Sequence, residues 1–590
     1  MCGVIGYVGE KEANPIILNG LRHLDYRGYD SVGVALLDGN SLIVKKDVGK
    51  VDEIHSKLNF LEPPVNLALG HSRWATHGEV TQANAHPHLD CSGSIAVVHN
   101  GIIENYQELK RWLIKKGHTF RSETDTEVVP HLVEEEMKKE KDFVEAAKLA
   151  VKKLKGSYAL LLVHKGEKKI VAARKGSPLV IGVADHGYFV ASDIPAFLEF
   201  TKKVVYLHDY DFVVLSPKKF EVFNLLEWKR VKRKIDTIEW DAEQASKGEF
   251  EHFMMKEVAE QVDTVQRAAQ QDRRIIENVV EEMKKAKGIF LIGCGSSYHA
   301  CLAASYIFSK IAKFHVNVVL ASEFPNYEHF LTRETLVVAL SQSGETYDVL
   351  EAVRAAKKRG SKVISIVNVI GSSLTRESDA FLMMNAGPEI CVLSTKTYTS
   401  QLALLLLLAY ALAGRYDEGK KRLTYLWNVI YNLTSRTTRE KVKELAKKLV
   451  KKEHIFCIGR GLQYATSLEA ALKVKEVSYI HAEAFAGGEL KHGTIALIEK
   501  GTPCLAFVSE ENEGEAILNA TEVKARGGYI IGVSPKNNEV FDFWVKVPDC
   551  NTENAIVQII PIQILAYYLA VLRGCNPDYP RNLAKSVVVK

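Results

Sequence analysis

The chain has 590 residues, which is enough for several hydrophobic cores and for more than one chemistry. Apolar residues make up 47% and charged residues 25%, close to the average of folded globular proteins, so the composition excludes a disordered or fibrous chain. The net charge of +5 comes from 77 basic and 72 acidic residues, an excess too small to indicate a nucleic-acid partner.

Cys2 is the first chemically informative position. The initiator methionine is commonly removed before a small residue, which would leave a cysteine that carries both a thiol and a free α-amine. An α-amine with a pKa of about 7.7 to 8.0 can take the thiol proton as the sulfur attacks a carbonyl group. A cysteine can also occupy this position by chance, because such a base is useful only in a site built around it.

Short β-rich runs separated by Gly and Asp turns fill residues 1–235 and predict a sheet-dominated domain. From Asp236 to Glu251 the composition becomes polar and acidic, and a helical pattern follows. We therefore expect a domain boundary there, with a linker and a first helix over residues 236–277.

Five further motifs in this region accompany Cys2. They are YRGYDS (26–31), HSRWATHG (71–78), NAHPH (84–88), HNGIIEN (99–105) and SETDTE (122–127). Together with Cys2 they resemble the class II glutamine amidotransferases, which are N-terminal nucleophile hydrolases. The resemblance covers the whole first domain and implies an αββα sandwich with glutaminase activity.

Glutamine hydrolysis by a thiol makes specific chemical demands. Thioester formation develops an oxyanion, which the Asn100 amide and the Gly101 backbone N–H can stabilise. The substrate α-carboxylate calls for an arginine and its α-ammonium for a carboxylate, for which we choose Arg73 and Asp125. The resemblance further implies a glutamine pocket lined by Thr76 and His77, closed by His86 and lying beside Trp74 on the ammonia path. His86 and Trp74 could instead be packing residues.

The C-terminal part contains an internal repeat. IFLIGCGSSYHACLAA from Ile289 aligns without a gap with IFCIGRGLQYATSLEAA from Ile455. Each copy predicts a buried parallel strand, a Gly-x-Gly turn and a helix, so we expect two doubly wound α/β domains over 278–417 and 444–580. Tyrosine stands where the third glycine of a dinucleotide motif would be, so no nicotinamide or flavin cofactor is predicted.

Hydroxyls cluster after the second predicted strand of the first copy, in the segment SQSGET from Ser341. Hydroxyls and unpaired N–H groups at a helix N-terminus can bind phosphate, although one of these hydroxyls could be an ordinary N-cap. The loop and the segment GCGSSYHA resemble those of sugar isomerase domains. This resemblance implies a sugar-phosphate site made by Ser296, Ser297, Ser341, Gln342, Ser343, Thr346 and Ser394.

The second copy lacks this loop and carries other groups. Glu469, Lys473 and Glu476 are spaced to lie on one helical face, either as a surface salt-bridge ladder or as part of a site. The motifs around them and PRNLAKSV resemble amidotransferases that form an amino-sugar phosphate. The resemblance implies Glu476 as the C1–C2 proton shuttle, Lys473 as its neighbour, His492 in ring opening, and Lys585, in a tail over 581–590, as the Schiff-base lysine.

The two halves together imply that glutamine nitrogen converts fructose 6-phosphate to glucosamine 6-phosphate, with ammonia passing through a channel between domains. Two alternatives stay open. An amidotransferase acting on phosphoribosyl pyrophosphate would need a Thr-Gly-Thr type loop, which the sequence after residue 240 lacks. A sugar-phosphate-sensing regulator could dispense with Glu476, His492 and Lys585, which are all present.

The nine cysteines form no CxxC pair and no His/Cys cluster at zinc-ligand spacing, so we expect reduced thiols in the cytoplasm and no metal. Two apolar stretches, Leu402–Ala413 and Ala555–Leu572, are expected to be buried helices rather than membrane spans. By analogy with isomerase domains that pair, we expect a homodimer.

Overall fold

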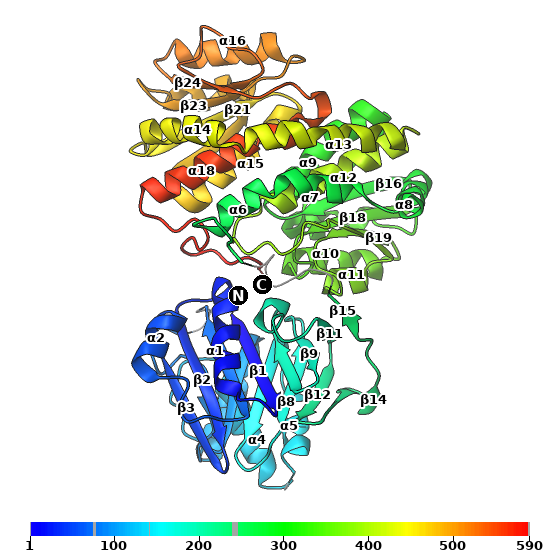
Figure 1. Ribbon diagram of the computed structural model, residues 1–590. Coiled ribbons are helices and arrows are strands. Elements are labelled where there is room, and N and C mark those ends of the chain that lie inside the picture. The colour runs from blue at the N-terminus through cyan, green and yellow to red at the C-terminus, as the bar shows by residue number, and fades with distance from the viewer. Residues whose placement is uncertain (1, 75–77, 141, 239–245, 588–590) are drawn as a thin grey trace. The chain divides into compact units, whose positions relative to one another are not determined.

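The computed structural model describes residues 2–74, 78–140, 142–238 and 246–587. It divides into two compact units, Met1–Ala245 with Ala584–Lys590, and Ser246–Leu583 (Figure 1).

The first unit is built on two antiparallel sheets. The eight-stranded sheet has the order β15 (Asp236–Thr237), β11 (Lys203–Tyr206), β9 (Val180–Ala184), β10 (Gly187–Ala191), β1 (Gly3–Gly9), β4 (Leu67–Arg73), β2 (Ser31–Asp38) and β3 (Ser41–Val48). The seven-stranded sheet has the order β14 (Lys229–Val231), β13 (Lys219–Asn224), β12 (Asp211–Ser216), β8 (Ile170–Lys175), β7 (Gly156–His164), β6 (Ile95–Ile103) and β5 (His88–Leu89). Its helices are α1 (Ala13–His23), α2 (Val51–Leu58), α3 (Tyr106–Lys115), α4 (Val128–Met137) and α5 (Phe143–Val151).

Side-chain alternation along the strands produces the layers of this unit. In β1, Val4 belongs to the core between the two sheets, whereas Ile5 packs in the core under α1 and α2. In β7, Leu161 lies in the inter-sheet core and Leu160 in the core under α4 and α5. Each sheet is therefore apolar on both faces, and the predicted αββα sandwich is confirmed.

The second unit contains two five-stranded parallel sheets with the same strand order. The first is β17 (Asn317–Leu320), β16 (Gly288–Gly293), β18 (Thr335–Ser341), β19 (Lys362–Val367) and β20 (Ala380–Met383). The second is β22 (His481–Ala486), β21 (His454–Gly459), β23 (Pro503–Phe507), β24 (Tyr529–Ser534) and β25 (Phe543–Lys546). Its α-helices are α6 (Phe253–Ala259), α7 (Gln261–Ala269), α8 (Arg273–Lys285), α9 (Ser296–Ala312), α10 (Tyr347–Lys358), α11 (Ser373–Glu377), α12 (Lys396–Leu412), α13 (Tyr416–Leu433), α14 (Arg436–Leu449), α15 (Leu462–Ser478), α16 (Glu513–Lys524), α17 (Asn554–Val557) and α18 (Ile560–Leu572).

One hydrophobic core runs through both predicted α/β domains of this unit. Leu291 of β16 and Cys457 of β21 both point into it, together with apolar side chains of α9, α12, α15 and α18. The opposite faces of the two sheets have separate cores, under α10 in the first domain and α16 in the second. Helices therefore cover both faces of each sheet, as a doubly wound fold requires (Figure 1).

Both apolar stretches are helices of this core. Every residue from Leu402 to Tyr410 in α12 is buried. The segment Asn551–Leu572 is long and apolar enough to cross a membrane, but 83% of its most apolar window is buried inside the protein. This burial accounts for its apolar composition without a membrane.

The unit boundaries differ in detail from those expected from sequence. The first unit continues past residue 235, because β15 pairs with β11. Helix α13 fills most of the stretch between the two predicted isomerase domains, and the tail from Ala584 onward is grouped with the first unit.

Candidate active sites

Cys2 lies at the start of β1, where its thiol is held by the backbone of Trp74. Its Sγ accepts a hydrogen bond from the Trp74 N–H at 3.1 Å and lies 3.3 Å from the Trp74 carbonyl oxygen. Burial raises the pKa of the thiol, while the amino-terminal charge and the Trp74 amide act to lower it. The sulfur is thus in a partly buried site where an amide donor can stabilise a thiolate.

Asn100 and Gly101 lie on β6, and Asn100 is bonded to the backbone of Cys2. The Asn100 Nδ2 donates to the Cys2 carbonyl oxygen at 2.7 Å, and its second N–H leaves one donor for an oxyanion. Gly101 has φ +131°, and a Cβ atom there would lie 2.2 Å from the Ser157 carbonyl oxygen on β7. The close approach of β7 is therefore the reason why glycine is required at this position.

Arg73 and Asp125 are both buried in the first unit. Arg73, at the end of β4, donates to the carbonyl oxygens of Glu79 at 3.1 Å and Gly78 at 3.2 Å. Asp125 accepts from the Ile103 N–H at 2.6 Å. These bonds fix an arginine and a carboxylate in the same unit as the thiol, and their binding of glutamine stays a prediction.

Two of the predicted pocket residues, Thr76 and His77, lie outside the described residues. Trp74 is described, and its ring makes an edge-on contact with Tyr29 at a centroid distance of 5.4 Å. Its clear role in the structure is to present its backbone N–H to the Cys2 sulfur.

His86 lies in a cluster of buried histidines. Its ring stacks on His71 at 4.0 Å and contacts His88 edge-on at 4.6 Å. The His86 Nδ1 accepts from the His99 N–H at 3.3 Å, which requires a lone pair on that nitrogen. Burial lowers the pKa of His71 to about 3 and those of His86 and His88 well below their usual range, so the cluster is neutral. The structure thus shows His86 in a packing role, and its proposed closure of the glutamine pocket stays a prediction.

In the second unit, the serine-rich loop joins β18 to α10. The Ser341 Oγ is 2.9 Å from the Thr346 Oγ1 and accepts from the Gly344 N–H at 3.0 Å, while the Ser343 Oγ accepts from the Glu345 N–H at 3.1 Å. Gly344 has φ +65°. The loop therefore converges at the N-terminus of α10, an arrangement that suits an anion.

Gln342 and Ser297 also belong to the predicted phosphate site. The carbonyl oxygen of Gln342 accepts from the Asn368 N–H at 3.0 Å, which fixes the loop against the end of β19. The Ser297 hydroxyl, on the first turn of α9, accepts from the Gln401 Nε2 at 3.0 Å.

Glu469, Lys473 and Glu476 form a buried charge cluster on α15 rather than a surface ladder. The Lys473 Nζ lies 2.8 Å from a Glu476 oxygen and 3.4 Å from a Glu469 oxygen. The side chains of Lys473 and Glu469 are both 0% exposed. Buried charges are costly unless they are paired, so this helix face is specialised for chemistry or for precise positioning.

The first isomerase domain contributes to the same cluster through α9. The Ser296 hydroxyl donates to Glu469 at 2.8 Å and accepts from Lys473 at 3.1 Å, and the His299 Nδ1 lies 2.8 Å from Glu469. Ser394, predicted for the phosphate site, bonds instead through its carbonyl oxygen to Lys473 at 3.2 Å. Sequence reasoning placed Glu469 on this helical face without giving it a role, and it did not select His299, although His299 lies one turn after Ser296 in a selected motif.

The pKa shifts distinguish the roles of the three groups. Burial lowers the pKa of Lys473, but the Glu469 and Glu476 carboxylates outweigh it and hold the net value above the ordinary range. Burial raises the pKa of Glu476 despite the attraction of Lys473. Lys473 is therefore a fixed cation, and Glu476 is a carboxyl group whose pKa is raised above its ordinary value.

His492 and Lys585, the other two predicted catalytic residues of the sugar site, lie outside α15. His492 ends a 3₁₀ turn on the exposed loop after β22. In the described part of the chain, no hydrogen bond or ion pair links it to Glu476 or Lys473. Lys585 belongs to the segment grouped with the first unit. Their catalytic roles stay predictions.

The two site-bearing units match known protein families. A glutamine amidotransferase domain model matches residues 71–199, and a SIS domain model matches residues 282–411 and 448–573. A relative from Pyrococcus horikoshii, named glutamine–fructose-6-phosphate aminotransferase (isomerizing), is 45% identical over 598 residues, and the match covers 100% of both chains.

The chain belongs to this family. A second member, from Thermococcus kodakarensis, is 46% identical over 603 residues with the same full coverage. The C-terminal domain of the enzyme from Francisella tularensis has 34% sequence identity and a TM-score of 0.53, covering 57% of this chain and 100% of that one. Membership in the aminotransferase family confirms the predicted order of a glutaminase domain followed by two isomerase domains.

Proposed function

We propose that this protein hydrolyses L-glutamine at Cys2 and uses the released ammonia to convert D-fructose 6-phosphate to D-glucosamine 6-phosphate. The observation that carries the proposal is the buried cluster of Lys473 between Glu469 and Glu476, with Ser296 and His299 beside it. A protein that only senses a sugar phosphate has no use for an acid–base group held in this way. Full-length likeness to aminotransferases named for glutamine and fructose 6-phosphate supports the same conclusion.

The glutaminase step begins with attack of the Cys2 sulfur on the substrate amide carbon. A C–S bond forms, the C–N bond breaks and ammonia leaves; water then hydrolyses the thioester to glutamate. The second N–H of Asn100 and the Gly101 N–H stabilise the oxyanion, and Arg73 and Asp125 hold the α-carboxylate and α-ammonium. The α-amine of Cys2 serves as the base, which requires removal of Met1.

The sugar step needs a group that opens the sugar ring, an amine that bonds to the open carbonyl carbon, and a base that moves a proton between C1 and C2. His492 assists ring opening, and Lys585 forms a Schiff base at the open C2 carbonyl with loss of water. Ammonia then displaces the Lys585 amine to leave a C2 imine, and Glu476 moves a proton from C1 to C2, which gives the C1 aldehyde and C2 amine of the product. Because the carboxylates keep Lys473 protonated, Lys473 is not the nucleophilic amine; it is a fixed cation that holds Glu476. The serine-rich loop before α10 binds the phosphate.

Three finer features belong to the same proposal. Ammonia passes between the two reactions through a closed path, which prevents its loss to protonation and diffusion. The protein works in the cytoplasm, in keeping with nine free cysteines. It works as a homodimer, by analogy with isomerase domains that pair.

The decisive experiment follows glucosamine 6-phosphate formation from fructose 6-phosphate with glutamine or with an ammonium salt. We expect the wild-type protein to use glutamine, and Cys2→Ala to lose glutamine-dependent synthesis while keeping ammonium-dependent synthesis. Product from phosphoribosyl pyrophosphate, or binding of the sugar phosphate with no turnover, would favour the two alternative functions. Synthesis from glutamine by Cys2→Ala at the wild-type rate would refute the proposal.

A further inference from the structure

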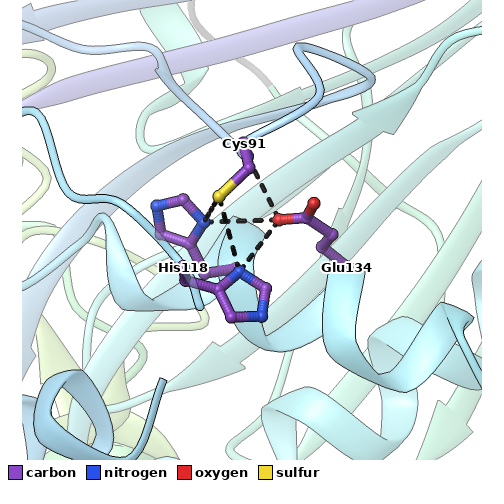
Figure 2. Close-up of side chains that lie close together, drawn as sticks. Cys91, His118 and Glu134 are labelled. Atoms are coloured by element: carbon purple, nitrogen blue, oxygen red, sulfur yellow. Dashed lines mark hydrogen bonds and ion pairs between the residues drawn. The ribbon is translucent and has the colours of Figure 1, made fainter. Parts of the chain in front are cut away.

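Four potential metal ligands meet in the first unit, outside the glutamine site. Cys91 lies in the turn between β5 and β6, His118 follows α3, and His131 and Glu134 lie one turn apart on α4. One ligand atom from each residue lies within 4.8 Å of all the others. Figure 2 shows the side chains of Cys91, His118 and Glu134 pointing toward one another.

Four of the distances between these atoms are close to those of a tetrahedral site. The Cys91 Sγ lies 3.6 Å from the His118 Nδ1 and 3.5 Å from the His131 Nδ1. A zinc ion bound at ~2.3 Å to sulfur and ~2.1 Å to nitrogen with tetrahedral angles holds those two atoms about 3.6 Å apart. The Glu134 Oε2 lies 3.0 Å from the His118 Nδ1 and 3.4 Å from the His131 Nδ1, near the ~3.4 Å that the same geometry requires.

The far nitrogens of both imidazoles also face carboxylates. The His118 Nε2 is 3.2 Å from the Glu135 Oε2, and the His131 Nε2 is 3.6 Å from the Glu127 Oε1. A neutral imidazole has only one N–H and cannot donate to two carboxylates. If Nδ1 binds a metal, Nε2–H donates to the outer carboxylate, which is the usual arrangement around metal-bound histidine.

The charges of the four side chains also favour a bound divalent ion. The side chains of His118 and His131 are 2% and 1% exposed, so two imidazolium ions there would be deeply buried. A divalent ion with a thiolate, one carboxylate and two neutral imidazoles has no net charge. The Cys91 sulfur also accepts from the Thr119 N–H at 3.4 Å, as a metal-bound thiolate commonly does.

We propose that Cys91, His118, His131 and Glu134 form a zinc site. Sulfur, two imidazoles and one carboxylate in tetrahedral array suit zinc rather than magnesium or calcium, which prefer oxygen ligands. Four protein ligands fill the coordination sphere, so the ion is structural and not catalytic.

The four ligands come from three separate segments of the chain: the turn that carries Cys91, the segment after α3 that carries His118, and α4. Through His131 the site connects to Glu127, which accepts from the backbone N–H groups of Arg121 at 2.7 Å and Ser122 at 2.6 Å. This segment contains Asp125, so the ion stabilises the loop that, on the proposed function, holds the glutamine ammonium. Loss of the ion is therefore expected to loosen this loop as well as the unit as a whole.

Metal analysis of the purified full-length protein tests the proposal without reference to activity. We expect about one zinc per chain after dialysis against zinc-containing buffer and desalting, and a lower thermal midpoint after treatment with a chelator, restored by zinc but not by magnesium. Cys91→Ala should lower zinc affinity more than 10-fold, and Glu135→Ala, which removes only an outer carboxylate, about 10-fold to 100-fold. The matched control Cys575→Ala removes a partly exposed thiol that is not one of the four ligands and should keep the metal.

Cobalt substitution tests the ligand sphere directly. We expect the visible bands of tetrahedral cobalt together with a sulfur-to-cobalt charge-transfer band that is absent in Cys91→Ala. A wild-type protein that retains no zinc, or whose cobalt spectrum lacks the sulfur band, would overturn the proposal and leave a cluster of buried imidazolium–carboxylate pairs. Because the wild-type measurements decide this, the result does not depend on the folding of a variant, and it is independent of any glutamine or sugar assay.

Discussion

Lys473 Nζ lies 2.8 Å from a carboxylate oxygen of Glu476, three residues further along α15. The same ammonium lies 3.4 Å from a Glu469 oxygen, and the Lys473 side chain is fully buried. A single cation therefore holds two carboxylates in place. Burial raises the pKa of Glu476, and the attraction of Lys473 acts against this rise.

Lys473→Met should remove the cation and keep most of the side-chain volume. Because two carboxylates then lack their partner, we expect synthesis to fall about 10²-fold to 10⁴-fold and the isomerase unit to lose about 3–5 kcal/mol of stability. Glutaminase activity should persist. The assay compares synthesis, glutamine hydrolysis and the thermal midpoint, with Lys475→Met on the exposed side of the same helix as control. A normal rate of synthesis in Lys473→Met would contradict the assigned role.

Lys585 is expected to be the amine that bonds to the sugar. Lys585→Arg keeps the positive charge but cannot form a Schiff base, so synthesis should be lost while glutamine hydrolysis remains. Borohydride reduction in the presence of fructose 6-phosphate, followed by peptide mass mapping, should place the adduct on Lys585 in the wild-type protein. An adduct on Lys473 would show that the two lysines have been assigned the wrong way round. Deletion of residues 581–590 should have the same effect on synthesis.

Gly101→Ala tests the requirement for close approach between β6 and β7. The added Cβ would lie 2.2 Å from the Ser157 carbonyl oxygen at a φ of +131°, so strands or side chains must shift. Gly39→Ala is the matched control, since Gly39 has φ +55° but nothing within 4 Å of the added atom. We expect a cost of about 1–2 kcal/mol for Gly39→Ala. Gly101→Ala should cost about 1–3 kcal/mol more. Urea unfolding measures both losses of stability. Equal losses would show that the positive φ alone, and not the close approach of β7, sets the cost of adding a Cβ atom.

The buried histidines should make the first unit sensitive to acid. Burial lowers the pKa of His71 to about 3, and those of His86 and His88 are also depressed. Below a pH of about 6.5 the unfolded chain takes up protons that the folded cluster does not, so stability falls by about 1.4 kcal/mol per pH unit for each histidine. This loss of stability continues until the pH falls to the pKa that each histidine has in the folded protein.

Urea midpoints measured at several pH values below about 6.5 give the slope of stability against pH. His71→Gln should reduce this slope, because one of the groups with a depressed pKa is gone. A pH-independent midpoint between about pH 6.5 and pH 4 would show that the cluster takes up protons while folded.

Much of this protein could be predicted from the sequence because the relevant signals are local in the chain. Cys2 is defined by its position at the terminus, the repeat by a gapless match of strand, turn and helix, and the Glu469, Lys473 and Glu476 face by helical spacing. The repeated turn even has the same backbone: Gly295 has φ +53° and ψ −126°, and Gly461 has φ +56° and ψ −124°.

Only the tertiary structure decided which of these groups meet. Ser296 and His299 reach Glu469 across more than 160 residues, and the four ligands around Cys91 come from a turn, a loop and a helix with no recognisable spacing. The sequence predicted no metal for that reason, and it gave no sign that His86 stacks on His71. The physical reason is that periodicity determines which face of an element a side chain occupies, whereas the packing of whole elements determines what lies opposite that face.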